Sequence, residues 1–120
     1  MAEAYKVVPF VDWNQIPWEP GRVGTERKIF AGKGVTIILS RVRRALFKPR
    51  PHSHNYEHIV YQISGDAEFH VATETYHLVP GSCLLVPAEV SHYGIPLTDE
   101  FINMDAMPVE PGDIKIVFQD

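Results

Sequence analysis

Residues 51–65 read PHSHNYEHIVYQISG, so three histidines stand directly before a run of β-branched and aromatic residues. His52 and His54 are two positions apart, and in an extended strand such residues point to the same face. Their imidazoles can therefore approach one point in space. His58 follows a short turn at the start of the next run and can face the same point from a neighbouring strand.

His92 is a fourth candidate ligand, at the end of the stretch VPAEVSH that covers residues 86–92. Neutral imidazole binds first-row divalent ions well, so one ion of zinc, manganese, iron, nickel or copper is the natural occupant of such a cluster. Two histidines on one strand face are also common on surfaces that bind no metal. The prediction of a metal therefore depends on the surrounding sequence as well as on the pair.

The surrounding sequence resembles the two motifs of the cupin family, G-x5-HxH-x3,4-E-x6-G and G-x5-PxG-x2-H-x3-N. The resemblance extends over roughly residues 27–109. The residues that carry it are His52, His54, His58 and Gly65 in the first motif, and Gly81, Pro87 and His92 in the second. It implies a jelly-roll barrel and a metal ion held by the four histidines, with His58 in the place of the usual glutamate.

The sequence departs from these motifs at three further positions. Leu46 stands where the first motif begins with glycine, Glu89 replaces the glycine of the second motif, and Pro96 replaces its final asparagine. None of these changes removes a ligand. Metal binding by four neutral imidazoles therefore remains the expectation.

The pattern of the whole chain independently predicts an all-β fold. Short β-rich runs alternate with turns rich in glycine and proline, and no window shows a helical period longer than a turn or two. This pattern is typical of an antiparallel sandwich or barrel. We expect one domain over residues 1–120, with an N-terminal arm and loop (1–26), a barrel core (27–109) and a C-terminal strand or tail (110–120).

Composition restricts the partners and the location. A net charge of −4 over 120 residues argues against nucleic acid as a partner, because phosphate binding needs a concentrated basic surface. One basic group is either a solvated strand face or a site for an anionic substrate, and it consists of Arg41, Arg43, Arg44, Lys48 and Arg50. The sequence shows no signal-peptide pattern and no apolar run approaching ~20 residues, which predicts a soluble, cytoplasmic protein without a membrane segment.

The single cysteine and the N-terminal arm lead to two further expectations. Cys83 excludes an internal disulfide, and its apolar neighbours predict a buried, inert thiol. The family resemblance implies a homodimer, since small cupins usually pair through an edge of the sheet and the N-terminal arm can supply the pairing strand.

The histidine set indicates which chemistry to expect. An ion held by four neutral imidazoles keeps its full charge and has open positions for water or substrate. We expect a mononuclear metal-dependent enzyme that acts on a small oxygenated molecule by redox-neutral ring opening, cyclisation or isomerisation. Two alternatives stay open: an O₂-dependent dioxygenase that uses the same ligands, and a non-catalytic cupin that binds metal or ligand.

Asp105 and Gln62 are the candidate catalytic residues. Asp105 lies in the otherwise apolar stretch 101–107, where a carboxylate is costly unless it is paired, hydrated in a cavity or functional. We assign it as a general acid/base, with a loop-edge salt bridge as the alternative. Gln62 shares the strand parity of His58, so we expect it to face the cavity and orient the substrate. His70 and His77 lie between the two motifs and are expected at the surface or in packing.

Four short stretches also resemble the small cupins of the pectin-degradation type, which open unsaturated uronate rings. They are IPWE (16–19), RKI (27–29), PHSH (51–54) and IVY (59–61). In that group an Asp two residues before a Phe, with an Arg soon after, completes the site. Asp105 matches the Asp, whereas Met107 replaces the Phe and no Arg follows. The four-histidine set is similar, in addition, to small manganese cupins with oxidative activity and to a zinc-binding cupin cyclase of aromatic polyketide biosynthesis.

Overall fold

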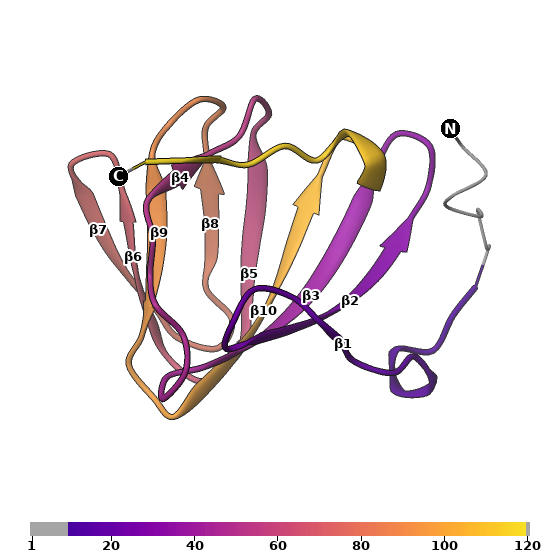
Figure 1. Cartoon of the computed structure of the whole chain (residues 1–120), viewed down its shortest axis with the longest axis horizontal. Helices are drawn as coiled ribbons and strands as arrows, with labels where there is room; N and C mark the ends of the chain where they lie inside the picture. The colour runs from indigo at the N-terminus through magenta and orange to yellow at the C-terminus, as the bar shows by residue number, and fades with distance from the viewer. Residues whose placement is uncertain (1–9, 120) are drawn as a thin grey trace.

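A computed structural model describes residues 10–119, which fold into two facing antiparallel β-sheets (Figure 1). In spatial order the larger sheet contains β1 (Glu19–Pro20), β2 (Thr25–Ala31), β3 (Thr36–Arg43), β10 (Glu100–Met107), β5 (His58–Ser64) and β8 (Cys83–Val86). The smaller sheet contains β11 (Val117–Phe118), β4 (His52–Ser53), β9 (His92–Pro96), β6 (Ala67–Val71) and β7 (Glu74–Leu78). The all-β antiparallel fold predicted from the sequence is confirmed.

The core lies between the sheets because each strand turns alternate residues inward. In β5 the side chains of His58, Val60 and Gln62 are buried, and those of the residues between them are exposed. Facing strands of the smaller sheet contribute Ala67, which is fully buried, and Phe69. Alternate positions of β5 and β10 therefore look into one shared interior, and this arrangement positions the site.

The same alternation contradicts the prediction for Cys83, which is exposed. β8 turns Leu84 and Val86 inward, so that Cys83 and Leu85 point away from the core. The apolar run predicts continuous burial, but only one face of this strand is covered by the second sheet. The thiol is therefore accessible in the chain described here.

Both ends of the described chain contribute to the sheets. β1 pairs with β2, and β11 pairs with β4, so regular structure extends beyond residues 27–109 on both sides. The C-terminal segment crosses one end of the barrel, above β5 and β8 (Figure 1). Within residues 10–119 the helices are the short 3-10 turns η2 (Trp13–Gln15) and η3 (Pro111–Asp113), and none could reach across a bilayer.

Candidate metal centre

Three histidines from distant parts of the chain meet at one end of the barrel. His52 in β4 is the cross-strand partner of His92 in β9, and the centroids of their rings are 4.4 Å apart. The ring of His54 lies 5.2 Å from each of the other two. One ring nitrogen from each residue falls within 4.8 Å of the other two, which is a spacing at which one ion can be shared after a small closure.

Hydrogen bonds to main-chain carbonyls set the tautomer of these three rings. The Nδ1 atoms of His52, His54 and His92 lie 2.9, 2.8 and 2.9 Å from the carbonyl oxygens of Arg50, Lys115 and Val90, respectively. A carbonyl oxygen only accepts, so each Nδ1 carries the proton and donates it. The lone pair is left on Nε2, which is the arrangement that orients histidine as a metal ligand.

His58 reaches the cluster from the opposite sheet. Its ring centroid lies 5.1 Å from those of His54 and His92, but it is not a member of the close group of three. The neighbouring-strand placement expected for it is wrong, because β5 and β4 belong to different sheets. Its Nδ1 is buried and has no hydrogen-bond partner. An orphaned imidazole nitrogen in this position is consistent with a ligand role that the protein alone does not satisfy.

All four imidazoles are held in the neutral form. Burial, with mutual repulsion between the rings, lowers the pKa of His58 to about 3. Burial likewise lowers the pKa of His52 to about 4 and depresses that of His54 and His92. At neutral pH no proton competes for the nitrogen lone pairs, so this donor set fits a divalent transition ion. Such an ion would be held by His52, His54 and His92, with His58 available as the fourth donor.

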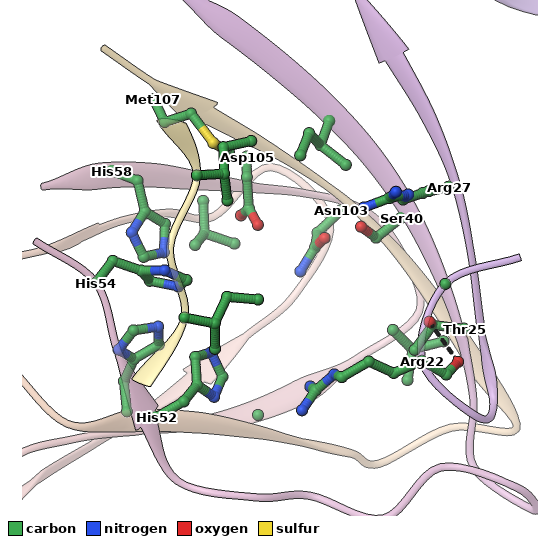
Figure 2. Close-up of a pocket in the computed structure, with 18 of the residues that line it drawn as sticks. Arg22, Thr25, Arg27, Ser40, His52, His54, His58, Asn103, Asp105 and Met107 are labelled. Atoms are coloured by element: carbon green, nitrogen blue, oxygen red, sulfur yellow. Dashed lines mark hydrogen bonds between the residues drawn. The ribbon is translucent and has the colours of Figure 1, made fainter. Parts of the chain in front are cut away.

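The histidines line one side of a cavity of about 220 Å³ between the sheets. Figure 2 shows His52, His54 and His58 on one side, Asn103 and Ser40 on the other, and Asp105 between His58 and Asn103. Phe69 and Phe101 pack with ring centroids 6.4 Å apart and give the cavity an apolar wall. A small molecule in this space would contact both the histidine cluster and the polar groups of β10.

Asp105 faces this cavity from the middle of β10, where its strand partners are Ile38 and Val60. Its side chain is partly buried and lines the cavity, and its Oδ1 atom is buried and lacks a hydrogen-bond partner. Burial raises the pKa of the carboxyl to about 7. The pKa of Tyr56 is raised to about 12 by burial and by the charge of Asp105, which places the two side chains near each other.

Gln62 is not among the residues that line this cavity, so its role in orienting a substrate stays a prediction. Its side chain is fully buried, and its Nε2 donates to the carbonyl of Gly65 at 3.0 Å. Gln62 does lie on the inner face of β5, as its strand parity predicts. At that position along the strand, however, the inner face meets the turn after β5, because the strand runs away from the histidines.

Two features of the site were missed in the sequence. Arg22 lines the cavity from the loop between β1 and β2, and the C-terminal segment supplies both the carbonyl of Lys115 and the ring of Phe118, 5.7 Å from His52. Neither carries a local signal. As expected, the other two histidines lie elsewhere: His70 contacts Glu68 at 2.8 Å, and the exposed His77 contacts a neighbouring carboxylate.

Two antiparallel sheets that enclose a cavity, with histidines from both sheets meeting in it, define this chain as a cupin. More narrowly, it belongs to the family of AraC-like ligand binding domains, whose sequence model matches residues 34–115. No curated protein sequence matches the chain.

Solved structures with the same fold come from several bacteria. KdgF from Halomonas sp. superposes with a TM-score of 0.78 at 22% identity, over 87% of this chain and 97% of that one. An RmlC-like cupin from Shewanella frigidimarina superposes with a TM-score of 0.79 at 18% identity, over 88% of this chain and 95% of that one. The polyketide cyclase RemF from Streptomyces resistomycificus superposes with a TM-score of 0.74 at 17% identity, over 94% of this chain and 87% of that one. At these identities the likeness establishes the fold alone.

Proposed function

We propose that this cupin is a mononuclear metal-dependent enzyme that catalyses redox-neutral chemistry on a small oxygenated molecule. The observation that carries the proposal is Asp105, a carboxyl with a pKa of about 7 in the same cavity as four neutral histidines. A divalent ion bound there would supply Lewis acidity to a carbonyl or hydroxyl oxygen of the substrate. The polyketide cyclase RemF among the structural neighbours shows that this fold accommodates an enzyme.

Asp105 would act as the proton carrier. A general acid/base works best when its pKa is near the operating pH, because both protonation states are then available. Since Oδ1 has no partner in the protein, a proton can be held at this carboxyl without breaking an existing hydrogen bond. β10 is paired with β3 on one side and with β5 on the other. These two hydrogen-bonded ladders fix the backbone of Asp105, so its carboxyl is positioned before substrate arrives.

Metal content is the first test. Protein purified without added metal, or after loading with zinc, should hold one divalent ion per chain by inductively coupled plasma mass spectrometry. His92→Ala should lose that ion, because it removes a donor whose Nε2 is oriented for binding. His70→Ala is the matched control and should keep it, since His70 lies in the β6–β7 hairpin and contacts Glu68. Failure of the parent protein to take up any first-row ion would refute the proposal.

Proton transfer is the second test. In D₂O, the loaded protein should speed hydrogen–deuterium exchange at carbon atoms beside the carbonyl in a panel of small hydroxyketones, followed by NMR. Asp105→Asn should lose this activity and keep the metal, whereas Asp99→Asn, at an exposed carboxylate, should change neither. Retained exchange in Asp105→Asn would remove the residue from the mechanism. Oxygen consumption with phenols or diketones would instead assign the dioxygenase chemistry.

A non-catalytic role is the second candidate, and the family itself favours it. The matching family is described as a ligand binding domain, which implies recognition of a small molecule without turnover. Under this reading the loaded protein would bind members of the same panel, as measured by calorimetry, and return them unchanged. The exchange experiment therefore separates the two candidates.

We also propose that the chain forms a homodimer through the outer face of β5, β8 and β10. Most outward residues there are uncharged, namely Ile59, Tyr61, Ile63, Cys83, Leu85, Ile102, Met104 and Ala106, and the charged Glu100 stands at the end of the face where β10 begins. Ile59 and Leu85 are about half exposed, at 48% and 54%. An exposed apolar patch marks an association site, and a largely uncharged face limits the local repulsion between two copies with a charge of −4 each.

The dimer and its face can be tested together. Light scattering should give twice the chain mass, and Tyr61→Lys should give a monomer because it places a charge at the centre of the face. Labelling of Cys83 by a thiol reagent should slow as protein concentration rises, and this protection should disappear in the variant. A monomer at all concentrations would contradict the proposal. The predicted pairing by the N-terminal arm concerns residues 1–9 in part, which lie outside the described chain, and the cytoplasmic location stays a prediction.

A further inference from the structure

Arg22 differs from the other arginines near the cavity in having no acidic partner. Four others contact a carboxylate, in the pairs Arg27–Glu19, Arg41–Glu26, Arg43–Glu26 and Arg44–Asp99. Within residues 10–119 Arg22 forms no ion pair, although it lines the cavity. Three members of the basic group at residues 41–50, Arg41, Arg43 and Arg44, are thus engaged by Glu26 and Asp99, whereas Arg22 comes from another segment and lines the cavity itself.

The loop that carries Arg22 is held rigidly. The carbonyl of Arg22 accepts hydrogen bonds from Thr25, from its backbone nitrogen at 2.8 Å and from its Oγ1 at 2.7 Å. Gly24 has a φ of 84°, and a Cβ atom there would lie 2.5 Å from the backbone nitrogen of Phe47. Only glycine allows this close approach. The loop is therefore fixed against residues 46–47, and the start of the Arg22 side chain is fixed with it.

Aromatic rings then guide the guanidinium toward the histidines. Its Cζ lies 5.5 Å from the ring centroid of Phe47 and 5.2 Å from that of Phe118, distances at which a cation is attracted to a ring face. The Phe118 ring in turn lies 5.7 Å from that of His52. Figure 2 shows the Arg22 side chain extending from its loop into the cavity, on the side opposite Asp105.

The charges of the cavity favour an anion. The positive charge of Arg22 is opposed by one carboxyl among the described lining residues, that of Asp105, which is not fully ionised at neutral pH. Burial and the nearby Arg50 lower the pKa of Arg22, so the guanidinium is incompletely compensated in this position. A divalent ion on the histidines would add to this positive potential, in a protein whose net charge is −4.

We infer that Arg22 is the anion-binding residue of the cavity, so that the substrate carries a carboxylate in addition to the oxygen held at the histidines. A carboxylate matches the planar fork of a single guanidinium, and a cavity of about 220 Å³ suits a small acid. Arg22 and the histidines line the same cavity, with Phe118 near both Arg22 and His52, so one small molecule can place a carboxylate at Arg22 and a different oxygen at the histidines. The inference rests on the proposed metal-dependent function and names its substrate class.

Two probes that differ in one charged group test the inference. Succinate can place one carboxylate at the metal and the other at Arg22, whereas succinamate has an uncharged amide in place of one carboxylate. Calorimetry on zinc-loaded protein should show that succinate binds roughly tenfold or more tightly than succinamate. Arg22→Gln should abolish this preference, and Arg22→Lys should retain part of it because the charge stays while the fork is lost.

The control and the opposing outcomes separate this inference from the proposed function. Arg44→Gln removes one positive charge at an exposed position and should leave the preference unchanged. Equal binding of the two probes, no binding of succinate, or a preference that survives in Arg22→Gln would overturn the role of Arg22 while leaving the zinc site intact. If zinc itself does not bind to the parent protein, the proposed function fails and the inference falls with it.

Discussion

Replacing Asp105 with asparagine tests whether this carboxyl is as strongly desolvated as the structure indicates. Its Oδ1 is buried without a partner, and burial raises its pKa from 3.8 to about 7. At 1.36 kcal/mol per pH unit, the rise means that ionised Asp105 costs the folded protein about 4 kcal/mol. The unfolded chain releases its proton first. The cost is therefore absent below pH 3.8, grows as the pH rises, and is complete above about pH 7.

Asp105→Asn removes the charge and nearly preserves the shape, so the variant should be more stable than the parent at neutral pH. The difference in free energy of unfolding should widen by about 2–3 kcal/mol between pH 5 and pH 8. Urea unfolding at the two pH values measures it, with a chelator present because a bound cation would stabilise the carboxylate. Asp99→Asn, whose parent side chain is 99% exposed, should show no such widening.

Two results would refute the reasoning. A stability difference that is the same at both pH values would mean that Asp105 keeps an ordinary pKa and is hydrated. A parent protein that becomes the more stable of the two at pH 8 would mean that a cation pairs with the carboxylate in the metal-free chain. Either outcome would also remove the physical basis for its role as proton carrier.

Three further changes test the frame of the site. Glu89 has a φ of 66° and stands where the cupin motif has glycine, so Glu89→Gly should raise stability by about 1 kcal/mol in urea unfolding; a lower midpoint would contradict a strained backbone. Gly24→Ala should destabilise the fold by more than about 1 kcal/mol in the same assay, because the added Cβ meets the backbone of Phe47; an unchanged midpoint would show that the loop can shift. His58→Ala should weaken zinc binding less than His92→Ala in a competition titration, since His58 lies outside the close group of three; equal losses would argue for four equivalent ligands.

The shared face of His52 and His54 was predictable because its cause is local, whereas their meeting with His92 was expected from the resemblance to the two cupin motifs. Alternation along a strand places His52 and His54 on one face, and the spacing of the second motif places His92 in a strand. Asp105 was recognisable in the same way, as a charge among apolar residues in β10. For each of these residues the chemistry and the strand parity could be read within a few neighbouring positions.

Other features depended on which strands face each other. The apolar neighbours of Cys83 suggest burial, yet β8 exposes the face on which Cys83 lies. The strand parity of Gln62 suggests that it faces the cavity, yet its side chain bonds to the turn at the end of β5. The alternation of residues along a strand predicts which side chains share a face. It does not state what covers that face, or how far along the strand the cavity extends.

The sequence alone determined the antiparallel β-fold, the family resemblance and the residue types of the metal site. These follow from backbone geometry that repeats every two residues and from spacing within short motifs. Only the tertiary structure decided that His58 enters from the opposite sheet, that Arg22 reaches the cavity, and that the C-terminal segment lies over the histidines. Those placements arise from contacts between segments far apart in the chain, for which no local pattern exists.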